Sequence, residues 1–79
     1  MKDNIASNAY SLIRRKKYKK AKDLLLSNRT ALNRDANALA MLAFANIFLK
    51  DFYAAEEVSR KALREDSFCV NAMIAKGYI

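Results

Sequence analysis

The chain has 79 residues, of which 53% are hydrophobic and 29% charged, with one glycine and no proline. This composition excludes a disordered segment, which lacks the apolar residues that a core needs, and the length allows one small domain. The formal net charge of +7 comes from residues 14–22, which hold seven basic residues and no acidic one, while the rest of the chain is balanced at eight of each.

Chemically similar residues recur along the chain at an offset of 34, here called the repeat period. This period divides the chain, as one domain spanning 1–79, into a first unit at 2–35, a second at 36–69 and a partial third at 70–79. The residues in register are Ile5, Leu39 and Met73; Ala9, Ala43 and Gly77; Ile13 and Ile47; Tyr18 and Phe52; Ala21 and Ala55; Leu24 and Val58.

Each complete unit is predicted to form two helices, because its apolar residues keep helical spacing. In the first unit the break falls at 16–18, so the basic run spans a turn between helices. In the second unit it falls at 50–52, where the Asp51 carboxylate can cap the next helix. A similar segment at 65–67 precedes a single helix of the third unit, which gives an all-α chain of five helices.

These residues resemble the tetratricopeptide repeat, a helix-turn-helix unit of the same length with small residues where neighbouring helices cross. The resemblance implies a right-handed superhelical stack, and it implies that the chain is a fragment of a longer array or is completed by another molecule. Asn33 and Ser67 replace the helix-breaking proline of the family and are expected to cap the helices that follow. Asn28 stands where the family has alanine. The matching residues are Leu39, Leu42, Ala43, Phe52, Ala55 and Ala62.

The resemblance also implies a concave groove lined by the first helix of each unit. Tyr10, Phe44 and Tyr78 would form an aromatic ladder along it, with one ring per unit. The rings either fill the core between helices or form an apolar binding surface. The side chains expected on this face are Ala6, Tyr10, Ile13, Ala40, Phe44, Phe48, Ile74 and Tyr78.

Some grooves of this family clamp a terminal carboxylate with lysine, arginine and asparagine side chains. Of the residues at the matching positions, only Asn71 could contact a carboxylate. The sequence therefore disfavours a co-chaperone that binds chaperone tails. The matching residues are Ala6, Tyr10, Met41, Asn71 and Ala75.

The basic run has three interpretations: a solvated corner, a contact for an acidic protein, or a site for nucleic acid or nuclear import. Tyr18 is in register with Phe52, a packing position, so its ring is expected to be buried rather than free to stack on a base. A solvated corner is the favoured interpretation. The run contains Arg14, Arg15, Lys16, Lys17, Lys19, Lys20 and Lys22.

The sequence predicts a protein-interaction scaffold that takes a partner helix or peptide in the groove. The alternative is self-association through the same groove, as in the assembly modules of multi-subunit complexes, and nucleic-acid binding is the least favoured. An enzyme is not expected, and neither is a metal or a cofactor, because histidine, a cysteine–base pair and a glycine-rich phosphate loop are all lacking.

The expected cellular location is inferred from the lone cysteine, Cys69, and from the length of the apolar runs. A lone cysteine forms no internal disulfide, and no secretory signal precedes it, which together favour the cytoplasm, with the nucleus as the alternative. Cys69 is expected in the core. Residues 38–49 are too few for a bilayer, which needs about 20, so they predict a buried helix and no membrane partner.

Overall fold

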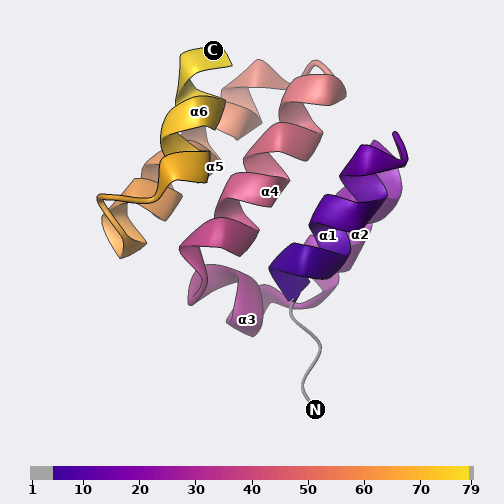
Figure 1. Cartoon of the computed structure of the whole chain (residues 1–79), viewed down its shortest axis with the longest axis horizontal. Helices are drawn as coiled ribbons and strands as arrows, with labels where there is room; N and C mark the ends of the chain where they lie inside the picture. The colour runs from indigo at the N-terminus through magenta and orange to yellow at the C-terminus, as the bar shows by residue number, and fades with distance from the viewer. Residues whose placement is uncertain (1–4, 79) are drawn as a thin grey trace.

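The computed structural model describes residues 5–78, which form helices joined by turns and contain no strand (Figure 1). The all-α class is thus confirmed. None of the helices in this range has the length and apolar character to cross a bilayer. The six helices are α1 (Ile5–Arg14), α2 (Tyr18–Ser27), α3 (Arg29–Asn33), α4 (Ala36–Phe48), α5 (Phe52–Glu65) and α6 (Val70–Tyr78).

The turns that join α1 to α2 and α4 to α5 have the same backbone geometry at positions separated by one repeat period. Lys16 and Lys50 both lie in the left-handed region, with φ of 62° and 66°. In each turn the N–H of the next residue donates to a carbonyl five residues earlier, at 2.9 and 2.8 Å. A left-handed residue after a helix lets such bonds satisfy the last free carbonyl groups. The repeat period is therefore a property of the backbone as well as of the sequence.

Helix α4 lies at the centre of the molecule, between the α1/α2 pair and the α5/α6 pair (Figure 1). Nine of its 13 residues are buried. A helix that is apolar on every side is stable only when other elements surround it, which accounts for the long apolar run in the sequence. The predicted buried helix is confirmed, and it occupies residues 36–48.

Alanines lie at the points where helices pack most tightly. Five of those expected to be small packing residues have no exposed surface, because the neighbouring backbones come close enough to cover them. Cys69 is also buried, as expected for a core residue. The five alanines are Ala9, Ala21, Ala43, Ala55 and Ala62.

The prediction of five helices was wrong, because the second helix of the first unit is divided into α2 and α3. Asn28 donates from Nδ2 to the Leu24 carbonyl at 2.9 Å, and Ser27 donates from Oγ to the Asp23 carbonyl at 2.7 Å. Such bonds compete with the helix ladder, and the backbone leaves the helix at Asn28. The corresponding helix α5, with Ala62 at this position, continues unbroken.

The cap of α5 is the predicted one, whereas that of α4 is not. Asp51 accepts a hydrogen bond from the Ala54 N–H at 3.3 Å, as expected for an N-cap. At α4 the cap is Asp35, whose Oδ1 accepts from the N–H groups of Asn37 and Ala38 at 2.9 and 3.3 Å. Asn33 lies inside α3 and caps nothing.

Asp66 orders the segment before α6 but does not cap that helix directly. Asp66 Oδ1 accepts from the Phe68 N–H at 3.0 Å, and α6 begins only at Val70. Ser67 makes no side-chain hydrogen bond to any residue in 5–78, so its predicted capping role is wrong. The 65–67 segment thus shapes the connection between α5 and α6.

Candidate partner-binding groove

A hollow of about 320 Å³ lies on the face where α1, α4 and α6, the first helices of successive units, run beside one another. Its lining carries no charged side chain. It combines small, amide and apolar groups, which suits an uncharged segment of a partner. The lining residues are Ala6, Ser7, Tyr10, Asn37, Met41 and Asn71.

Two asparagines, one repeat period apart, form the polar wall of this groove. Asn71 Nδ2 donates to Asn37 Oδ1 at 3.3 Å, and the Cys69 thiol donates to the same oxygen at 3.5 Å. These bonds fix the orientation of the Asn37 amide. Asn37 Nδ2 makes no hydrogen bond to another described residue, so it and the second proton of Asn71 Nδ2 can donate to a ligand carbonyl.

Tyr10 and Met41 form the apolar part of the groove. Tyr10 is 51% exposed. The guanidinium carbon of Arg14, one turn further along α1, lies 5.8 Å from the centroid of its ring, a cation–π contact that limits its motion. Met41 is almost completely buried and forms the floor.

No protein-family model, curated protein or solved structure matches this chain. The side chains of the groove itself are therefore the evidence for what it can bind. They offer amide donors, one accessible aromatic ring and a thioether.

The aromatic ladder of the sequence analysis is divided between two environments. Tyr10 lines the groove, whereas Phe44 is half-buried and packs against the core clusters on both sides of α4. The Tyr78 side chain lies outside the described part of the molecule. Phe44 thus serves mainly to pack helices together, and Tyr10 is the ring that a ligand can reach.

The other predicted groove residues are distributed over several surfaces. Ala6 lines the groove, but Ala40 is fully buried and Ile13 packs against the core. Phe48 stacks on Tyr18 of α2, with ring centroids 4.6 Å apart, which places it at the far end of α4. Ile74 is exposed on α6.

The sequence analysis did not include Ser7, Asn37, Met41 or Asn71 in the groove. Ser7 and Met41 are one repeat period apart, as are Asn37 and Asn71, and this register was the signal that could have found them. Met41 and Asn71 were considered only as carboxylate clamp positions. The positions that match the carboxylate clamp all line the groove, except for Ala75, which is buried. None of them carries a basic residue.

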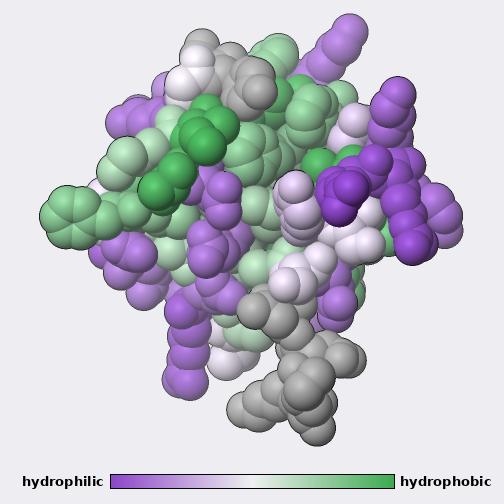
Figure 2. Space-filling model, viewed as in Figure 1, coloured by the Kyte–Doolittle hydropathy of each residue, from purple (hydrophilic) through white to green (hydrophobic). Residues whose placement is uncertain are grey.

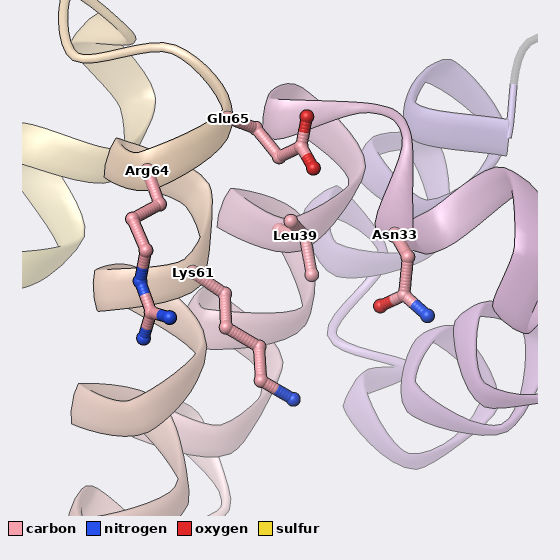
Figure 3. A pocket seen from close by; sticks show the side chains of 5 residues that line it. All are labelled: Asn33, Leu39, Lys61, Arg64 and Glu65. Atoms are coloured by element: carbon pink, nitrogen blue, oxygen red, sulfur yellow. The ribbon is translucent and has the colours of Figure 1, made fainter.

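A second hollow, of about 330 Å³, lies on another face and is lined from α3, α4 and α5 (Figure 3). The Glu65 carboxylate and the Lys61 amine extend in different directions there and form no ion pair. Within residues 5–78, no three His, Cys, Asp or Glu side chains gather as metal ligands would. This hollow offers no evident arrangement for chemistry. Its lining is Asn33, Leu39, Lys61, Arg64 and Glu65.

Proposed function

We propose that this chain is a tetratricopeptide-type interaction module, which binds an extended segment of a partner protein in the groove between α1, α4 and α6. The repeated turn geometry and the fully buried alanines at equivalent positions support this assignment. A groove assembled from the first helix of each unit is what the resemblance implies.

The asparagine pair is the observation that carries the proposal. An extended peptide has free backbone carbonyl groups, whereas those of a helix are already bonded within the helix. Free amide protons on Asn37 and Asn71 therefore favour an extended ligand over a helical one. One apolar side chain of the ligand would then pack against Tyr10 and Met41.

Replacing Tyr10 with alanine should weaken ligand binding by about tenfold or more, since an interface aromatic often contributes more than about 1 kcal/mol. The ligand would be selected from random peptides displayed on phage, and its Kd measured by fluorescence anisotropy with the purified chain. Asn71→Ala should also weaken binding, through loss of the amide donor.

Tyr53→Ala is the matched control, because Tyr53 is 78% exposed on α5 and lies outside the groove. It should bind the selected peptide as the wild type does. Equal affinities of the Tyr10 and Tyr53 variants would contradict the proposal, as would a library that yields no ligand.

Self-association is a second candidate, favoured by apolar side chains that α6 leaves exposed (Figure 2). Met73 is 48% exposed, whereas Leu39, its register partner, is 2% exposed in a core cluster that includes Ala62 of α5. Val70 and Ile74 extend the same exposed surface. A helix from a second copy could cover this face as α5 covers its equivalent.

Met73→Glu should keep the chain monomeric if this second candidate holds, because a buried unpaired carboxylate would oppose the interface. Light scattering over a dilution series should show the wild-type mass rising with concentration. Leu26→Glu, at an exposed apolar position on α2, should behave as the wild type. A single-chain mass at every wild-type concentration would exclude self-association.

A further inference from the structure

The segment 14–22 and the turn 49–51, here together called the basic edge, lie near one another at the upper end of the molecule in Figure 1. The Tyr18 ring stacks on Phe48, which joins the start of α2 to the end of α4. A shallow hollow of about 340 Å³ is lined by Leu49 of the second turn together with Lys16, Lys17, Tyr18, Lys19 and Lys20.

The basic edge carries the positive excess of the whole chain, and that charge is not compensated. Six of its seven basic side chains from 14–22 are exposed, Lys22 is half-buried, and none forms an ion pair with a described residue. Lys50 adds one more charge from the second turn. Asp51 is the acidic residue within the two turns, and its carboxylate is occupied in capping α5.

Large apolar side chains are exposed directly before and after Lys50 and Asp51 in the chain. Leu49 is 41% exposed, Phe52 48% and Tyr53 78%, and they follow one another within the second turn and the start of α5. Lysine ammonium groups next to exposed aromatic and aliphatic groups are typical of surfaces that lie at the boundary between water and lipid.

Three kinds of partner carry the negative charge that this edge would attract. Single-stranded nucleic acid stacks its bases on open aromatic faces, but the ring that lines the hollow, Tyr18, is half-buried and stacked on Phe48. The exposed rings of Phe52 and Tyr53 lie outside the lining of the hollow. Protein interfaces favour arginine and are depleted in lysine, whereas four lysines surround the hollow. A diffuse anionic surface needs neither open rings nor precise pairing.

We propose that the basic edge binds the surface of membranes that contain anionic lipids. The lysines of 16–20 lie among the headgroups, and Leu49, Phe52 and Tyr53 enter the interface beside them. The sequence analysis expected no membrane partner because no segment is long enough to span a bilayer. Peripheral contact of this kind needs no such segment.

The test is sedimentation of the whole chain with vesicles of pure phosphatidylcholine or of an equal mixture of phosphatidylcholine and phosphatidylserine. Wild type should bind only the mixed vesicles, and added salt should release it. Replacing Lys16, Lys17, Lys19 and Lys20 together with glutamine should weaken binding by about 100-fold or more, since each charge near the surface contributes about fivefold.

The matched control removes four positive charges outside the basic edge. They belong to two exposed residues, Arg29 and Arg34, and to two in the second half of α5. This control should keep most of the binding, and circular dichroism should show both variants folded. Tyr53→Ala should weaken vesicle binding several-fold, whereas Tyr10→Ala should leave it unchanged. The control substitutions are Arg29→Gln, Arg34→Gln, Lys61→Gln and Arg64→Gln.

Three results would overturn the proposal. The first is a wild-type chain that does not sediment with mixed vesicles. The second is an equal loss of binding in both quadruple variants, which would show a response to net charge alone. The third is tighter binding to a single-stranded or duplex oligonucleotide than to vesicles, lost in the lysine variant, which would assign the basic edge to nucleic acid instead.

Discussion

Leu25→Ala should lower the free energy of unfolding by about 2–5 kcal/mol. Leu25 lies on α2 with no exposed surface and belongs to the main core cluster. Removing its side chain leaves a cavity that the surrounding helices fill only partly. A domain of this size has about 4–12 kcal/mol of stability in total. Urea denaturation followed by far-ultraviolet circular dichroism would therefore show a large shift of the midpoint.

The adjacent Leu26 gives a control with identical chemistry. Leu26 is 37% exposed, so its replacement with alanine should cost less than about 1 kcal/mol. Equal losses for the two variants would mean that α2 presents a different face to the core. In the second unit the position of Leu25 is held by Ser59, whose buried Oγ has no hydrogen-bond partner. The stabilisation from a buried leucine at this position is therefore found in the first unit and not in the second.

The positions of the turns could be predicted from the sequence because their causes are local. α2 begins at Tyr18 and α5 at Phe52, each at the last residue of a predicted break. Asp51 caps the second of these helices through bonds that span only a few residues. The repeat period then relates one turn to the other without knowledge of the packing.

The division of α2 from α3 could not be predicted with the same rules. Asn28 was recognised as unusual, but a side chain that bonds to a helix carbonyl four residues earlier does not always end the helix. Its amide and the Ser27 hydroxyl both bond to helix carbonyl groups, and the helix ends there.

The hollow lies between the helices that were expected to line a groove, but it opens on a different face of α4 from the expected one. Ala40 was expected to line it, whereas Ala40 is fully buried and the next residue, Met41, lines it instead. One residue rotates a helical position by about 100°. Because α4 is apolar on every side, hydrophobic periodicity does not determine which of its faces is open.

Ala43→Leu should lower the free energy of unfolding by about 1–3 kcal/mol, because the larger side chain has no room where three helices meet. Ala43 has no exposed surface and shares a core cluster with Ala55 of α5, Ala75 of α6 and Ile47. Urea denaturation would measure the loss. Ala31→Leu, at an exposed position on α3, should change stability by less than about 0.5 kcal/mol.

Ala43→Leu should also weaken peptide binding, although Ala43 does not line the groove. Movement of α6 away from α4 to admit the leucine would stretch the 3.3 Å bond between Asn71 and Asn37, because that bond spans the two helices. Fluorescence anisotropy with the selected peptide should therefore show reduced affinity while the protein is still folded. If Ala43→Leu left both stability and affinity unchanged, α4 and α6 would not be closely packed. The hydrogen bond between Asn71 and Asn37 would then not depend on the packing around Ala43.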